Sequence, residues 1–233
     1  MYQYKNLFIL DKKGNKEIFI NDKKYYRYMD IIYIPNLAHK LSIEDTISLS
    51  EIRVKLDTEA IDYQYSKNIS RHLLSVITSY NREHIIDFGC GGGFLLNCIE
   101  SNYGIKHYYG LDFAVNSISF AKLKQPNLCF KYQFQVFNKE NKIELADNSV
   151  DSIISCFVMH FPIFDNQINE LARVLKPSGQ FVYNDFSFNK HPLETELIIN
   201  KLIAKNFSVK TYIKSFRQNK CLKKHKIIIA TKK

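Results

Sequence analysis

From about residue 57 onward, the chain alternates short apolar runs with longer segments whose apolar positions recur at helical spacing. A short apolar, β-branched run is typical of a strand buried on both faces, and a 3.6-residue period is typical of a helix packed on one side. The alternation therefore predicts an α/β domain whose mostly parallel sheet is covered by helices on both faces. The expected strands lie within residues 84–88, 107–113, 128–137, 150–161 and 179–188, and the expected helices within residues 59–80, 94–103, 114–124, 165–175 and 192–207.

The first part of the chain has a different pattern. Its β-like pieces, NLFIL, KEIFI and KKYYRYMDIIYI, are separated by DKKGN and ND, which are turn signals. We therefore expect a small β-rich hairpin module in residues 1–56 and an α/β domain in residues 57–233. The α/β domain should end in two strands, within residues 207–216 and 224–232, that are separated by a basic turn.

Composition limits the classes of protein to consider. The 233-residue chain has no apolar run close to the ~20 residues that a membrane-spanning helix needs, and its first residues, MYQYKNLFILDKKGNK, lack the features of a secretory signal. We therefore expect a cytoplasmic protein without a membrane partner. The five cysteines, at positions 90, 98, 129, 156 and 221, form no CxxC pair and are odd in number, which favours reduced thiols over disulfides or a metal site.

The formal net charge of +10 raises the question of a nucleic-acid partner. Only six of the 33 basic residues are arginine, the better reader of phosphates and bases, and the excess of Lys, Asn, Ile, Tyr and Phe is what AT-rich codons produce. The charge is scattered except in the final stretch, KCLKKHKIIIATKK. A nucleic-acid surface is therefore the alternative to a small-molecule substrate.

The stretch HIIDFGCGGGFLL, residues 84–96, places four of the chain's eight glycines within five positions. Glycine lets the backbone turn sharply and lets a ligand approach it closely. A Walker loop needs Lys and Ser or Thr after its last glycine, where this chain has Phe94 and Leu95. A dinucleotide fingerprint needs a glycine at position 94, and Asp87 would repel a pyrophosphate by about 1 to 4 kcal/mol. The loop therefore does not fit an anionic ligand.

A ligand with a positively charged amino-acid end fits this loop better, because Asp87 can attract it while the glycine backbone packs against it. Asp112 ends the next expected strand, where an acidic side chain can accept hydrogen bonds from ribose hydroxyls. S-adenosylmethionine carries both groups.

The sequence resembles the class I S-adenosylmethionine-dependent methyltransferases from about Asp57 to its end. IIDFGCGGG matches the first motif of that family, YYGLDF the acidic second strand, DNSVDSIISCFVMHF the fourth-strand motif, and ELARVLKPSGQFVYND the loop into strand five. The resemblance implies a Rossmann-like, doubly wound seven-stranded sheet with an antiparallel last strand, and S-adenosyl-L-methionine as the cofactor.

Carried over to this sequence, the resemblance implies a loop around the methionine end of the cofactor, a ribose partner at Asp112, an adenine cover at Phe113, and Cys156 at the methionine end. The loop residues are Asp87, Gly89, Cys90, Gly91 and Gly93. The residue that reads the adenine amino group would be Asn138, Lys139 or Glu140, and the sequence does not choose among them.

The candidate catalytic residues are His160, Tyr65 and Tyr63. His160 follows the fourth strand at the carboxyl edge of the sheet, where ligands of doubly wound folds bind, and both tyrosines belong to the helix before the first strand. We expect a small-molecule acceptor under a cap formed by residues 1–56. The alternatives are an RNA methyltransferase that uses the basic C-terminal hairpin and a noncatalytic cofactor-binding partner subunit. SCFVMHF, in place of Asn/Asp-Pro-Pro-Tyr, disfavours adenine-N6 and glutamine targets.

Overall fold

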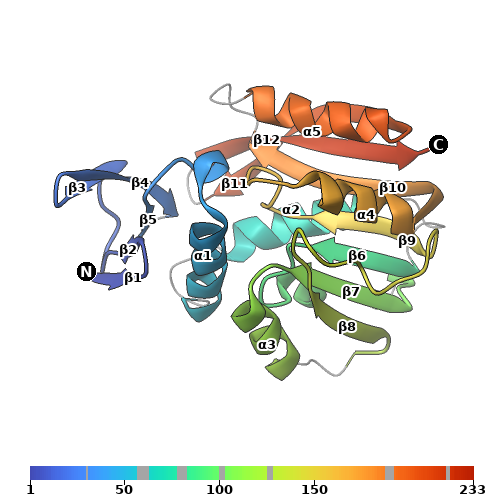
Figure 1. Ribbon diagram of the computed structural model, residues 1–233, viewed down its shortest axis with the longest axis horizontal. Helices are drawn as coiled ribbons and strands as arrows, with labels where there is room; N and C mark the ends of the chain where they lie inside the picture. The colour runs from blue at the N-terminus through green and yellow to red at the C-terminus, as the bar shows by residue number, and fades with distance from the viewer. Residues whose placement is uncertain are drawn as a thin grey trace.

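The computed structural model of the protein describes residues 1–29, 31–56, 63–77, 83–99, 103–124, 128–186, 192–218 and 221–233. Within these ranges the strands form two sheets, a five-stranded one near the N-terminus and a seven-stranded one (Figure 1). No helix in the described ranges is long and apolar enough to span a membrane.

The seven-stranded sheet has the order β11-β12-β10-β9-β6-β7-β8. Strands β6 to β10 run parallel, and β12 runs antiparallel to both of its neighbours, β10 and β11. This confirms the Rossmann-like sheet with an antiparallel last strand. The strands are β6 (His84–Phe88), β7 (His107–Asp112), β8 (Lys131–Val136), β9 (Val150–Ser155), β10 (Leu175–Phe186), β11 (Phe207–Gln218) and β12 (Cys221–Lys232).

Helices cover both faces of this sheet, as expected for strands that are apolar on both sides (Figure 1). Helices α2 (Tyr63–Val76) and α3 (Val115–Leu123) pack on one face, where Ile69, Leu73 and Ile118 join an apolar cluster with the strands. Helices α4 (Asp165–Val174) and α5 (Pro192–Ala204) pack on the other face in a second cluster. The two clusters form the core that fixes the carboxyl edge of the parallel strands.

The N-terminal sheet is antiparallel, with the order β1-β2-β5-β4-β3. It is larger than the hairpins that the sequence suggests, because five short strands pair and β2 and β5 are buried throughout. The elements are β1 (Tyr2–Tyr4), β2 (Leu7–Ile9), β3 (Glu17–Ile20), β4 (Lys23–Met29), β5 (Ile32–Ile34) and the short 3-10 helix η1 (Ala38–Lys40). A division of the chain at residue 56 stays a prediction, since residues 57–62 lie outside the described ranges.

Helix α1 (Ile43–Lys55) follows this sheet and was not expected from the β-like pattern of the first residues. Ser42 caps it, since the Ser42 side chain accepts a hydrogen bond from the Asp45 backbone amide. Leu49 and Ile52 on one side of α1 pack against the N-terminal sheet. In Figure 1 the helix stands between the two sheets.

Two other expectations change in detail. The helix expected within residues 94–103 is the 3-10 helix η3 (Phe94–Cys98), and residues 100–102 lie outside the described ranges. Leu95 and Cys98 are both buried there, and a spacing of three puts side chains on one face of a 3-10 helix. Strand β9 ends at Ser155 rather than near residue 161, because Phe157 turns the backbone with a φ of 61°.

Candidate functional site

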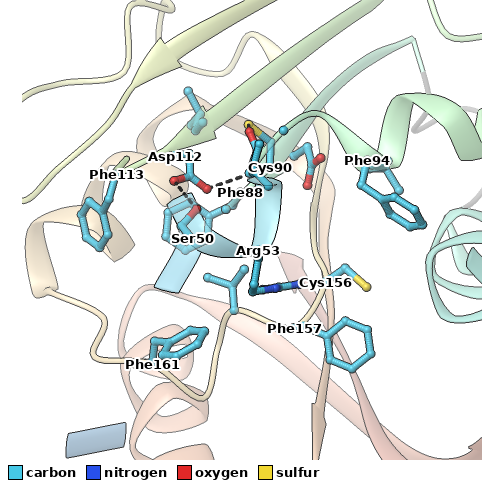
Figure 2. A pocket seen from close by; sticks show the side chains of 18 of the residues that line it. Ser50, Arg53, Phe88, Cys90, Phe94, Asp112, Phe113, Cys156, Phe157 and Phe161 are labelled. Carbon is cyan, nitrogen blue, oxygen red and sulfur yellow. Dashed lines mark hydrogen bonds between the residues drawn. The ribbon is translucent and has the colours of Figure 1, made fainter. Parts of the chain in front are cut away.

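A cavity opens at the carboxyl edge of β6, β7 and β9 and extends under helix α1. Figure 2 shows Asp112, Cys90 and Phe113 on one side of it, Cys156, Phe157 and Phe161 on the other, and Arg53 between them. The carboxyl edge of a doubly wound sheet is where ligands of this fold class bind. Most of the lining residues come from α1, α2, the glycine loop, the end of β7, and the segment that follows β9.

The glycine loop has the backbone shape that its sequence predicts. Gly89 has a φ of 78°, and a Cβ on it would collide with the Val158 side chain, so only glycine fits. Gly91 has a φ of 52°, and a Cβ built there would meet no atom within 4 Å. The loop thus leaves open space beside a bare backbone, which is suited to a closely packed ligand.

Asp112 is held firmly at the end of β7. Its two carboxylate oxygens accept hydrogen bonds from the Gly91 amide at 2.8 Å and the Ala114 amide at 2.9 Å, and the Ser50 hydroxyl lies 3.3 Å away (Figure 2). Burial raises the pKa of the Asp112 carboxyl above its ordinary value, while these hydrogen bonds oppose that rise. The carboxylate is therefore fixed in orientation at the wall of the cavity.

Asp87 is buried at the end of β6 and also lines the cavity. The Tyr108 hydroxyl donates a hydrogen bond to it at 2.6 Å. Burial raises the pKa of the Asp87 carboxyl to about 7, and the nearby Asp112 charge adds to the rise while the Tyr108 hydrogen bond opposes it. A cationic ligand group would compensate for the two neighbouring carboxyls.

Helix α1 forms a further wall of the cavity. Its lining residues are Thr46, Ser50, Arg53 and Val54. These positions lie at helical spacing on a face of α1 next to the one that carries Leu49 and Ile52. Two contacts tie the helix to the α/β domain. The Ser50 hydroxyl lies 3.0 Å from the Ser117 hydroxyl, and the Glu51 carboxylate accepts a hydrogen bond from the Asn116 side chain at 2.7 Å.

The segment after β9 forms an apolar wall. Cys156, Phe157, Val158, Phe161 and Ile163 all line the cavity, and burial raises the pKa of the Cys156 thiol to about 12. A thiol with so high a pKa stays protonated, so Cys156 can pack against a ligand but is no nucleophile.

Most of the cofactor residues expected from the sequence meet at this cavity. Those that line it are Asp87, Gly89, Cys90, Gly91, Asp112, Phe113 and Cys156. Gly93 does not line it: it precedes η3 with a φ of 80°, and the glycine beside it, Gly92, faces the cavity instead. Gly93 thus belongs to the turn into η3.

The two catalytic candidates whose side chains the structure describes, His160 and Tyr65, lie outside this lining. His160 lies against β4, with its Nε2 atom 3.1 Å from the Tyr28 hydroxyl. Burial, with smaller contributions from the Arg53 and His225 charges, lowers the pKa of His160 to about 3. Tyr65 is buried and hydrogen-bonds to His225. Tyr63 begins α2, and its side chain lies outside the described part of the structure.

The three residues considered for adenine recognition are also outside the lining of this cavity. Asn138 instead holds a turn, since its side chain accepts hydrogen bonds from the amides of Glu140 at 2.8 Å and Asn141 at 3.2 Å. Lys139 accepts a hydrogen bond from the Asn166 side chain through its carbonyl. Phe137, one residue earlier, lines the cavity.

Sequence reasoning missed the cavity residues of α1, above all Ser50 and Arg53. Ser42 and Asp45, spaced as in a helix cap, could have revealed the helix. No signal in the sequence could have shown which way the helix faces, because α1 meets the cavity only through long-range packing.

Comparison with known proteins shows the family to which this chain belongs. A family model described as a methyltransferase domain matches residues 80–231, well over half of the chain. Malonyl-[acyl-carrier protein] O-methyltransferase from Brevibacillus brevis is 29% identical over 147 residues, covering 58% of this chain and 52% of that protein. The tRNA N(3)-cytidine methyltransferase METTL2 from Bos taurus is 27% identical over 110 residues, covering 44% and 29%. The chain therefore spans about half or less of these curated relatives.

Solved structures share the fold. A chain in the complex between the Haloferax volcanii Trm112 methyltransferase activator and its methyltransferase has a TM-score of 0.61 at 14% identity, covering 79% of this chain and 98% of that one. A SAM-dependent methyltransferase from Aquifex aeolicus has a TM-score of 0.54 at 20% identity, covering 78% and 97%. At such low identity the likeness concerns the fold alone.

Proposed function

This chain belongs to the S-adenosylmethionine-dependent methyltransferases, and we propose that it methylates a small-molecule acceptor held beneath its N-terminal module. The observation that carries the proposal is the position of α1. The helix lines the cavity with Ser50 and Arg53, while β4 of the same module reaches His160 through Tyr28. A covered cavity suits an acceptor that fits inside it.

The cavity fits the cofactor of this family. Gly91 leaves open space beside the backbone, Asp87 is a buried carboxyl next to a second carboxyl, and Asp112 is fixed in orientation by two amides. We assign Asp87 to the ammonium group, Asp112 to the ribose hydroxyls, Phe113 to the adenine and Cys156 to the methionine end. Ser50 must then yield its contact with Asp112 to a ribose hydroxyl.

When bound, S-adenosylmethionine supplies an electrophilic methyl group on a sulfonium. The residues of this chain position the acceptor in line with that methyl and exclude water, which is the main catalytic requirement of such a transfer. The apolar wall formed by Phe157, Val158 and Phe161 supplies the exclusion. His160 stays neutral near pH 7, because its pKa is lowered to about 3, so we assign it to binding the N-terminal module through Tyr28.

The names of the relatives support two classes of methyl acceptor, a small molecule and an RNA. Malonyl-[acyl-carrier protein] and fatty-acid O-methyltransferases stand beside a tRNA N(3)-cytidine methyltransferase among the similar proteins. The covered cavity favours the first class, and the identity of the acceptor and the methylated atom stay open to experiment.

The test supplies the purified protein with methyl-labelled S-adenosylmethionine and a cell extract, with or without ribonuclease. We expect label in small metabolites, at a level that ribonuclease does not change. Label confined to RNA would contradict the small-molecule proposal. If the protein binds the cofactor but transfers label to no acceptor, the result would favour a noncatalytic partner subunit.

One observation supports RNA as the second candidate. Strand β12 pairs with β10 only from His225 to Thr231, so the outer ends of β11 and β12 pair with each other alone. This projecting end is basic and exposed, with Arg217, Lys223 and Lys224. If it binds RNA, replacing both lysines with glutamate should weaken binding of bulk tRNA and reduce its salt dependence, measured by fluorescence anisotropy.

A further inference from the structure

Arg53 is a cation in the wall of the cavity, and no described residue pairs with its buried Nε atom. Within the described ranges, no carboxylate forms an ion pair with its guanidinium. Leaving a guanidinium N–H buried and unpaired costs free energy, so a site that keeps one there is prepared for an acceptor from outside the chain.

The neighbouring carboxylate does not satisfy Arg53. Asp112 uses its oxygens for the amides of Gly91 and Ala114 and for the Ser50 hydroxyl. The Arg53 charge nevertheless acts on the groups around it: it opposes the burial-driven rise in the pKa of Asp112 and of Cys156. The guanidinium therefore lies between the end of β7 and the segment after β9, as Figure 2 shows.

The surroundings of Arg53 define the ligand group that it can bind. A planar guanidinium binds carboxylates through paired N–H donors. The walls beside it, Phe157, Val158 and Phe161, are apolar. A ligand that matches both features has a carboxylate attached to an apolar body.

We propose that Arg53 binds the carboxylate of an acidic, apolar acceptor, next to Cys156 and Phe157. The inference rests on the proposed function and narrows its acceptor to one chemical class. Arg53 belongs to α1, so the N-terminal module selects the substrate as well as covering it. The other source of a carboxylate in this cavity is the amino-acid end of the cofactor itself.

The first arm of the test uses benzoate and its neutral isostere benzamide, titrated by calorimetry into the protein saturated with S-adenosylhomocysteine. We expect benzoate to bind at least 10-fold tighter than benzamide to the wild type. Arg53→Met should abolish the preference, and Arg53→Lys should keep part of it. Lys55→Met removes a charge from the exposed side of the same helix and should change nothing. Equal binding of the two probes to the wild type would overturn the proposal whatever the variants do.

The second arm separates the two sources of carboxylate. It compares S-adenosylhomocysteine with 5′-methylthioadenosine, which lacks the amino-acid end, in the wild type and in Arg53→Met. We expect both affinities to change less than threefold. A loss of 10-fold or more for S-adenosylhomocysteine alone would assign Arg53 to the cofactor and overturn the acceptor assignment. Failure of the wild type to bind S-adenosylhomocysteine would instead contradict the proposed function itself.

Discussion

Asp87 is the residue whose environment most clearly points to a ligand. It is buried, it lies close enough to Asp112 for the two charges to interact, and the Tyr108 hydroxyl is the described contact that favours its charged form. Burial raises its pKa to about 7, so near neutral pH the empty site holds a large fraction of protonated Asp87. The group must ionise to accept an ammonium, which links cofactor binding to proton release.

We predict that cofactor affinity rises with pH until about pH 7 and then levels off. Below the raised pKa of Asp87, binding must remove a proton, so the affinity should increase by about tenfold per pH unit. The measurement is calorimetry of S-adenosylhomocysteine binding between pH 5.5 and 8.5. Asp87→Asn should bind more weakly and lose the dependence. An affinity that does not change with pH in the wild type would contradict this role of Asp87.

We predict that His160 stays neutral down to about pH 5. Burial lowers its pKa to about 3, because the protonated ring would lose hydration between Tyr28 and Phe161. Nuclear magnetic resonance titration of its imidazole measures this directly, with the ordinary histidine pKa of about 6.5 as the reference. A midpoint near 6.5 would restore His160 as a candidate base.

Some residues of the cavity could be predicted from the sequence, and others could not. The places of Asp87, Gly89 and Asp112 in the cavity wall could be predicted because each lies at or next to the end of a strand, which the apolar pattern locates. Arg53 could not, because its role depends on how α1 packs between the two sheets. The contact of Tyr65 shows the same limit, since its partner His225 is 160 residues away.

At the scale of elements, the strands of the large sheet were predictable and the helix over the cavity was not. Strands such as β6 and β9 are continuous apolar runs, which only a doubly covered sheet accepts. Helix α1 has mixed polarity because it contacts a sheet on one side and a cavity on the other. Because its apolar positions follow a helical period only weakly, the sequence pattern does not distinguish α1 from the β-like segments before it.

A buried polar chain connects four elements next to the cavity. Tyr65 on α2 hydrogen-bonds to His225 on β12, and the other nitrogen of His225 lies 3.2 Å from the Asn184 side-chain amide on β10. The side-chain oxygen of Asn184 accepts a hydrogen bond from the Phe157 backbone amide at 3.0 Å. Since only the oxygen can accept from an amide, the orientation of Asn184 is fixed, and the chain supports the strained turn at Phe157.

We predict that Tyr65→Phe lowers the free energy of unfolding by about 1 to 3 kcal/mol, because it removes a hydrogen-bond partner from a buried histidine. The affinity for S-adenosylhomocysteine should change less than threefold, since Tyr65 does not line the cavity. Urea denaturation measures the first effect. Tyr212→Phe, whose hydroxyl contacts His72 at the surface, is the matched control and should cost less than about 0.5 kcal/mol. An unchanged unfolding free energy for Tyr65→Phe would refute the structural role.

At the scale of the whole molecule, helix α1 and the parallel sheet together line one cavity. The parallel sheet supplies the glycine loop and two carboxyls, and the N-terminal module supplies α1 and the Tyr28 contact to His160. Methyl transfer requires that cofactor and acceptor share a site without water. Under the proposed function, we expect residues of α1 to shape the acceptor side of this cavity.

The most direct test of this account is the affinity for S-adenosylhomocysteine in the wild type and in Asp112→Ala, measured by calorimetry with NAD and ATP for comparison. The account predicts a loss of about 1 to 3 kcal/mol in the variant, since ribose hydroxyls lose a fixed acceptor in a partly buried site, and much weaker binding of NAD and ATP to the wild type. Asp147→Ala, at an exposed carboxylate away from the cavity, should leave the affinity unchanged. An unchanged affinity in Asp112→Ala would contradict the ribose assignment, and a preference for NAD or ATP would contradict the cofactor site.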